Sequence, residues 1–288
     1  MKTCVSSYSF NRVLQSGEFD QLTLMKKVKE MGFDAIEFTD LAPPSGVSVE
    51  DFAKQIREES EKLSLPVANY TIGGEFLNCE SLDTEVERLQ KCVDIAVILG
   101  AKGMRHDAAG GYRGSERSYK SFEQALGILV EGCRRVTDYA AEKGIVTMVE
   151  NHGFFCQDSL RVENLVTGVA SENFGVLVDM GNFLCVDEAP EVACGLLAPF
   201  AKHVHCKDFH VKSGNEPNPG QGFFTSRAGN YLRGAIVGHG NVAVTQCLAV
   251  LKKEGYNSYV SIEFEGMEEN IYAMEIGLDN LKKYIESI

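Results

Sequence analysis

The sequence predicts an α/β protein, a single-domain (β/α)8 TIM barrel over residues 1–288. Eight strand-like segments alternate with eight helical segments and no linker interrupts them, which favours a closed parallel sheet. The length suits such a barrel, which typically takes ~250 residues. Several strand-like segments also end on a carboxylate or a histidine, and the carboxyl ends of barrel strands are where active sites lie.

The strand-like segments are short apolar or alternating runs bounded by glycine or polar residues. They cover residues 3–8, 33–38, 67–70, 102–105, 145–150, 175–179, 201–208 and 259–264. The helical segments carry apolar residues at helical spacing. They cover residues 21–31, 49–63, 80–99, 119–143, 159–170, 187–197 and 242–253, and a last helix reaches the C-terminus. Gly32, Gly100 and Gly144 directly follow three of these segments, where glycine commonly ends a helix.

Residues 209–240 do not fit the alternation and are expected to be irregular, with many glycines and two prolines. Loops of this length are uncommon unless they serve a site. An open, doubly wound sheet is the alternative fold. It is disfavoured because no glycine-rich GxGxxG turn follows the first strand.

Composition narrows the class of partner. The formal net charge is −13, which repels a phosphodiester backbone and argues against nucleic acid. No apolar run approaches the ~20 residues that span a bilayer, and the first ten residues lack the apolar core of a signal peptide. The nine cysteines form no CxxC pair. We therefore expect a cytoplasmic protein with reduced thiols and no membrane partner.

Four late strands each deliver one metal-ligand side chain at their carboxyl end. Glu150 closes VTMVE, Asp179 closes VLVD, His205 lies in HVHCKD, and Glu263 lies in SIEFEG. Each residue alone could instead cap a helix or pair with a lysine. Together they predict a mononuclear metal site at the barrel mouth. Three carboxylates and one imidazole suit Mn²⁺, our first choice, and also Mg²⁺, Co²⁺ or Zn²⁺.

Strand alternation places further polar side chains at the same mouth. His203 shares the face of His205 but lies one layer deeper, so we leave it out of the ligand set. The predicted substrate-binding residues are Glu37, Arg105, His152, Asn182 and Lys207. For the cations, the alternative is an internal salt bridge with Glu37 or Asp208, and for His152 it is a surface loop.

Segments along nearly the whole chain resemble the xylose isomerase-like TIM barrels, in particular the sugar phosphate isomerase/epimerase group. They are GFDAIEF, VENHG, VDMGN, HVHCKD, GHGNV and SIEFEG. The resemblance implies that Glu150, Asp179, His205 and Glu263 hold the metal, and that the two glutamates form the acid/base pair of the ketose epimerases. The sequence departs from some epimerases at Asn182, where they carry histidine.

The resemblance implies a metal-dependent isomerase or epimerase of a small carbohydrate, in the form of a homodimer or tetramer. Glu150 or Glu263 would abstract the proton next to a carbonyl, the metal would stabilise the enediolate, and the other glutamate would return the proton. A dehydratase acting on an inosose or a dehydroshikimate-type compound is one alternative, and a non-catalytic barrel subunit is another. An endonuclease is disfavoured, because it would need a three-metal cluster and a basic face.

Overall fold

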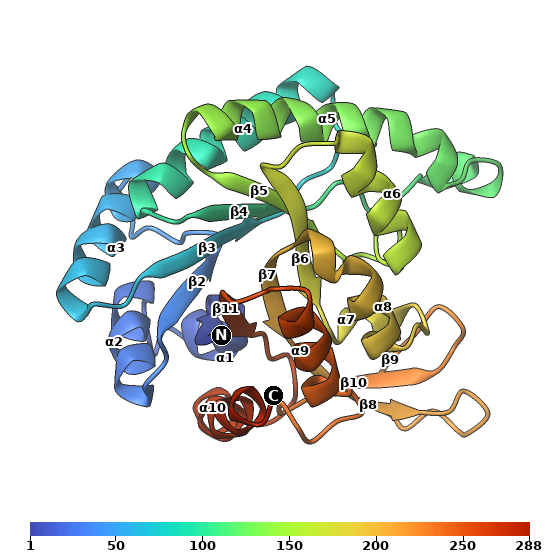
Figure 1. Cartoon of the computed structure of the whole chain (residues 1–288). Helices are drawn as coiled ribbons and strands as arrows, with labels where there is room; N and C mark the ends of the chain where they lie inside the picture. Colours follow the sequence, from blue (N-terminus) through green and yellow to red (C-terminus); the bar gives the residue numbers. More distant parts are fainter.

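Eight parallel strands close into the barrel that the sequence predicts (Figure 1). The computed structural model describes residues 1–288. The barrel strands are β1 (Lys2–Ser6), β2 (Ala35–Thr39), β3 (Val67–Ile72), β4 (Gly103–His106), β5 (Val146–Glu150), β6 (Phe174–Asp179), β7 (Ala201–Cys206) and β11 (Tyr259–Ile262). They follow one another around the barrel in chain order, and β1 pairs with β11 from Lys2 opposite Tyr259 to close it.

Helices form the outer layer around the strands (Figure 1). The long ones are α2 (Gln21–Met31), α3 (Val49–Leu63), α4 (Leu82–Leu99), α5 (Phe122–Glu142), α6 (Ser159–Val169), α8 (Pro190–Leu197), α9 (Val244–Lys253) and α10 (Asn270–Glu286). Two short helices, α1 (Asn11–Gln15) and α7 (Asn182–Cys185), follow β1 and β6. Gly32 and Gly100 cap α2 and α4 in the left-handed conformation, as expected.

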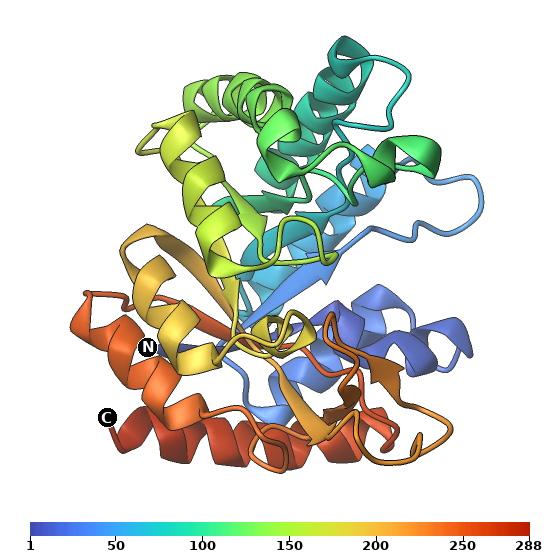
Figure 2. The same cartoon turned by 90° about the vertical axis from the view of Figure 1, so that its right-hand side faces the viewer.

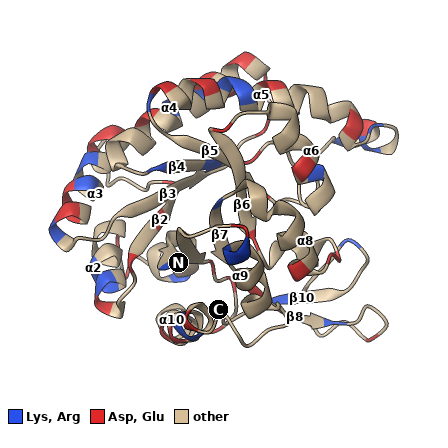
Figure 3. Cartoon of the chain, in the orientation of Figure 1, with Lys and Arg blue, Asp and Glu red and all other residues tan.

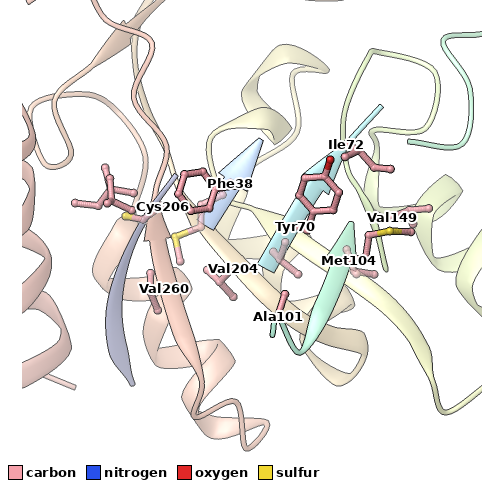
Figure 4. Packing of buried hydrophobic residues seen from close by; sticks show 14 of the residues in the cluster. Phe38, Tyr70, Ile72, Ala101, Met104, Val149, Val204, Cys206 and Val260 are labelled. Atoms are coloured by element: carbon pink, nitrogen blue, oxygen red, sulfur yellow. The ribbon is translucent and has the colours of Figure 1, made fainter. Parts of the chain in front are cut away.

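The hydrophobic core lies between the strands and the helices. Buried apolar side chains such as Phe38, Tyr70, Val204 and Val260 belong to one cluster with the inner faces of the helices (Figure 4). Charged residues follow the outer surfaces of α3, α4 and α5 (Figure 3). Because side chains alternate along a strand, the residues next to these apolar ones point into the barrel, where several are polar. No helix combines the length and the apolar composition that crossing a membrane requires.

One expectation was wrong. Residues 209–240 are not simply irregular: β8 (Asp208–Lys212), β9 (Phe224–Thr225) and β10 (Tyr231–Ala235) form an antiparallel sheet in the order β8-β10-β9. These strands are short and half exposed, so their sequence carries no buried apolar run. Phe209 and Leu232 anchor the sheet by packing with Cys185 of α7. Figure 2 shows this sheet at the end of the barrel opposite the two termini.

Asp208 fixes the turn that follows β10. Its carboxylate is almost fully buried and accepts hydrogen bonds from the backbone amides of Gly238, Gly240 and Val242 at 2.8–3.0 Å, and from Phe209 at 2.9 Å. This accounts for the GHGNV segment as a turn wrapped around a buried anion. The turn ties the β8–β10 sheet to the barrel.

We therefore expect Asp208→Ala to lower the free energy of unfolding by about 3 kcal/mol, since it leaves several buried amides without an acceptor. Urea denaturation monitored by circular dichroism measures this change. The control is Asp138→Ala on the exposed face of α5, which should change stability by less than about 0.5 kcal/mol. Equal stability of the two variants would contradict the role of Asp208.

Candidate metal centre

The four predicted ligands converge at the carboxyl end of the barrel. Their donor atoms all lie within 4.8 Å of one another, and Glu150, Asp179, His205 and Glu263 are all buried. His205 Nδ1 lies 3.8 Å from Glu150 Oε1, 3.7 Å from Asp179 Oδ2 and 3.6 Å from Glu263 Oε2. One imidazole nitrogen and three carboxylate oxygens therefore lie around a common point.

The donor set fits a divalent cation. Asp179 Oδ2 and His205 Nδ1 are buried and make no hydrogen bond, although the Lys207 ammonium lies 3.2 Å from Asp179 Oδ2 as an ion-pair partner. Buried polar atoms without hydrogen bonds are rare in folded proteins, and a binding site for an ion is one of the standard explanations. Three clustered carboxylates are also costly to bury without positive charge. A hard or borderline divalent ion would satisfy both requirements.

The turn after β6 holds Asp179 in place. Asp179 Oδ1 accepts hydrogen bonds from the amides of Gly181 at 2.8 Å and Asn182 at 2.9 Å, which leaves Oδ2 free to face the cluster. The Asn151 side chain bonds both the amide and the carbonyl of Asp179. Glycine is required at 181, because a Cβ there would lie 2.8 Å from the Lys207 carbonyl oxygen. The segments VENHG and VDMGN thus form one hydrogen-bonded unit.

Glu37 orients His205 from below. Its Oε1 lies 2.6 Å from His205 Nε2, and its Oε2 lies 2.6 Å from His203 Nε2. Burial raises the pKa of the Glu37 carboxyl, but the two imidazoles outweigh burial and bring that pKa down to about 2. A carboxylate that accepts from Nε2–H leaves Nδ1 as the free lone pair of His205.

This position does not suit the substrate contact expected of Glu37. The side chain is fully buried, and it is not among the residues that line the cavity above the ligands. His203 lies deeper than His205, as expected, and shares the same carboxylate.

Arg105 and Lys207 lie on either side of the ligand cluster. Arg105 Nη2 contacts Glu150 Oε2 at 2.7 Å and Asp107 Oδ1 at 2.8 Å. Lys207 Nζ contacts Glu263 Oε2 at 2.7 Å and Asp179 Oδ2 at 3.2 Å. Internal ion pairs therefore form, but with the ligand carboxylates and not with Glu37 or Asp208, the partners weighed from the sequence.

The two glutamate ligands have different electrostatic environments. Burial raises the pKa of Glu150 above its ordinary value, and Arg105 offsets only part of this effect. Burial acts on Glu263 in the same direction, but Lys207 and His205 outweigh it, so the pKa of Glu263 lies well below its ordinary value. Carboxyl pairs whose environments separate their pKa values are typical of acid/base sites.

Asn182 and His152 occupy different positions. Asn182 is buried, donates from Nδ2 to Glu150 Oε1 at 2.9 Å, and accepts from Lys207 Nζ at 3.2 Å. It therefore holds two residues of the site and does not line the cavity. His152 does line the cavity, with 49% of its side chain exposed, and its Nδ1 lies 3.1 Å from Asp107 Oδ1.

A cavity of about 310 Å³ lies above the cluster. Arg105, His152 and Lys207 line it, together with the ligands Glu150 and Glu263. The sequence analysis missed the other residues in the wall, which are Tyr8, Thr39, Asp40, Thr71, Ile72, Gly73 and Glu265. Strand parity could have found Glu265, which follows Glu263 by two residues, and Thr39, which follows Glu37 by two.

Comparison with known families decides the assignment. The family described as xylose isomerase-like TIM barrel matches residues 25–284. The chain belongs to this family. The resemblance inferred from the sequence segments is thereby confirmed, and no curated protein matches the sequence.

Several solved structures share the whole fold of this chain. The IolI protein with a bound zinc atom superposes with a TM-score of 0.76 at 14% identity, covering 100% of this chain and 99% of its own. The 3-keto-D-glucoside 4-epimerase YcjR from E. coli gives 0.71 at 17% identity, covering 98% and 99%. The probable 3-DHS dehydratase AsbF from Bacillus anthracis gives 0.73 at 17% identity, covering 97% and 99%.

Substitution of either Asp179 or His205, the two candidate ligands that do not line the cavity, should remove the metal. We expect His205→Ala and Asp179→Asn to lose Mn²⁺ after dialysis, because each removes a donor that faces the common point. Elemental analysis measures the metal content. Added Mn²⁺ should raise the melting temperature of the native protein alone, since a ligand at ~100 times its Kd stabilises by about 2.7 kcal/mol. His239→Ala, in an exposed turn, is the control, and full occupancy in both ligand variants would refute the assignment.

Glu37→Gln should weaken Mn²⁺ binding by roughly 10- to 100-fold. The substitution removes the carboxylate charge next to His205 Nε2, which keeps the proton on that nitrogen and leaves Nδ1 free for the metal. Titration calorimetry measures the affinity, and Glu30→Gln on the exposed face of α2 is the control. An unchanged Kd for Glu37→Gln would show that His205 needs no support from β2.

Proposed function

We propose that the protein is a divalent-metal-dependent isomerase or epimerase of a small carbohydrate, which abstracts a proton next to a carbonyl. One observation supports this above the others. Of the four candidate ligands, the two glutamates line the cavity, whereas Asp179 and His205 lie beneath it. Two carboxylates can therefore reach a substrate while they remain part of the metal centre.

In this proposal one glutamate removes the proton and the other returns it. Glu150 ends β5 and Glu263 follows β11, so the strands of Asp179 and His205 lie between them in the barrel. The carboxylates thus approach the cavity from separate parts of its wall. Return of the proton to the same carbon gives epimerisation, and return to the neighbouring carbon gives aldose–ketose isomerisation.

The cations in the cavity wall also suit a substrate with a carbonyl group. Arg105 and Lys207 bring positive charge to the cavity, where negative charge develops on the substrate oxygen. A cation bound by Glu150, Asp179, His205 and Glu263 would add Lewis-acid stabilisation of that charge. We propose Mn²⁺ as this cation, with Mg²⁺, Co²⁺ and Zn²⁺ as alternatives, because oxygen ligands with one imidazole suit all four. The zinc in the IolI structure agrees with a divalent ion.

A dehydratase is the second candidate. Proton abstraction would be the same, but the substrate would then lose a β-hydroxyl, which needs a proton donor. His152 lines the cavity with half of its side chain exposed and could supply that proton. A barrel that has lost its chemistry is less consistent with four intact ligands. The nine free cysteines support our proposal of a cytoplasmic location, and a homo-oligomer is proposed from the family resemblance alone.

Glu150→Gln should abolish exchange of the substrate proton while the fold is retained. Removal of a positioned acid or base typically costs 10²- to 10⁴-fold in rate. Proton NMR in D₂O, with Mn²⁺-loaded protein and a panel of ketoses, inososes and their phosphates, measures deuterium uptake at each carbon. The product formed distinguishes epimerase, isomerase and dehydratase.

Glu216→Gln, on the exposed loop after β8, is the matched control. Metal content is measured on the same samples, so that loss of exchange is separated from loss of metal. Exchange that persists in metal-loaded Glu150→Gln would reassign the base. Absence of exchange with every compound, from native protein shown to hold its metal, would favour the non-catalytic barrel.

A further inference from the structure

A second hollow beside the metal cavity is lined by cations. This hollow, the basic groove, has a volume of about 610 Å³ and includes the side chains of Arg117, Lys120, Arg161 and Arg227. No aspartate or glutamate lines it, although the chain has 41 acidic and 28 basic residues. The metal cavity is the opposite, with four carboxylates in its wall. A groove of cations on an acidic protein attracts anions.

The cations of the groove are only partly neutralised. Arg161 Nε and Arg227 Nη1 share one carboxylate oxygen, Asp158 Oδ2, at 3.3 and 3.1 Å. Lys120 pairs with Glu116, four residues earlier in the chain, and Arg117 makes no ion pair. Four cations therefore face two carboxylates, and both carboxylates lie outside the lining of the groove. The surplus positive charge points to a bound anion.

The arginines are held in place before any ligand binds. Arg227 Nη2 donates to the Phe154 carbonyl oxygen at 2.5 Å, and Arg161 Nη1 donates to the Phe155 carbonyl oxygen at 3.1 Å. The Arg161 guanidinium also lies over the Phe155 ring, 5.8 Å from its centre. Phe154 has a φ of +64°, a conformation that a bulky residue rarely adopts. Such strain is characteristic of functional loops.

The basic groove adjoins the metal cavity. His152 lines the cavity, and the next residue, Gly153, lines the groove. The loop after β5 thus forms part of both walls. The cavity cations Arg105 and Lys207 already pair with Glu150 and Glu263, whereas the groove has more cations than paired carboxylates, so an anionic group on a substrate would be attracted to the groove. A neutral keto-polyol end has no charge for the groove to bind and would lie in the metal cavity.

We propose that the basic groove binds an anionic group of the substrate, a phosphate or a carboxylate, at the end remote from the reacting carbonyl. The guanidinium fork pairs with both groups in bidentate fashion. This inference rests on the proposed function, since it assumes a substrate whose carbonyl lies in the metal cavity. It restricts that substrate to acidic sugars and sugar phosphates.

Binding of three matched sugars tests the groove. Titration calorimetry of the full-length, Mn²⁺-loaded protein compares D-fructose with D-fructose 6-phosphate and D-fructuronate, which differ only in the terminal group. We expect one of the two anions to bind at least ~10-fold more tightly than fructose, in line with charge-assisted hydrogen bonds. The tighter of the two identifies phosphate or carboxylate. The preference should shrink at high salt.

Arg117→Gln/Arg227→Gln should reduce the anion preference to less than ~2-fold and leave the fructose affinity unchanged. Arg117→Gln alone should lower the anion preference in part. Arg117 is exposed and makes no ion pair, so this substitution should not disturb the fold. The control is Arg135→Gln/Lys143→Gln on α5 and just after it, which removes the same charge from pairs with Asp83 and Asp94.

Two results would overturn the inference: neither anion binds more tightly than fructose, or the preference survives in Arg117→Gln/Arg227→Gln. Deuterium exchange is measured separately on the same samples. Anion preference without exchange would keep the groove and reject the proposed reaction. Exchange without anion preference would reject the groove alone.

Discussion

The burial of charge at the barrel mouth is the constraint on which the site depends. Glu150, Asp179, Glu263 and Glu37 are four buried carboxylates, and they share the barrel interior with two buried cations, Arg105 and Lys207. A histidine that ligates a metal must be neutral, so in the metal-bound state four negative charges against two positive ones leave a deficit of two. A divalent cation held by the four candidate ligands would remove that deficit. Asp179 Oδ2 and His205 Nδ1, the candidate donor atoms that make no hydrogen bond, belong to the two candidate ligands that do not line the cavity.

Strand periodicity accounts for how much of this could be predicted. Alternation along a strand tells which side chains point into the barrel. The distance of a residue from the strand end tells how close to the barrel mouth its side chain lies. His205 and Glu263 were placed correctly because each stands at or just beyond its strand end. Glu37 has the correct parity but lies opposite Ser6, one layer below Thr39, and its level follows from the register of β1 and β2. Register is a property of the paired strands and cannot be derived from one of them.

Loops were harder to derive than strands. The β8–β10 sheet was missed because its strands pair with one another outside the barrel, and short half-exposed strands leave no clear pattern in the sequence. Asp208 shows the same difficulty. Its place after β7 suggested a partner for Lys207, whereas its carboxylate binds the amides of a turn thirty or more residues later. Backbone donors carry no residue identity, so the sequence alone could not reveal this contact.

Asn182 connects the two halves of the site. Its amide donates to Glu150 and accepts from Lys207, and Lys207 in turn contacts Glu263, so a chain of polar contacts joins the two glutamates without passing through the ligand cluster. An asparagine amide donates from its nitrogen and accepts at its oxygen in fixed directions, so the chain sets the positions of both carboxylates together. An imidazole, as some epimerases carry at this place, could exchange protons along such a chain, whereas an amide cannot. In the proposed reaction, proton transfer is therefore left to the two glutamates and to the groups that line the cavity.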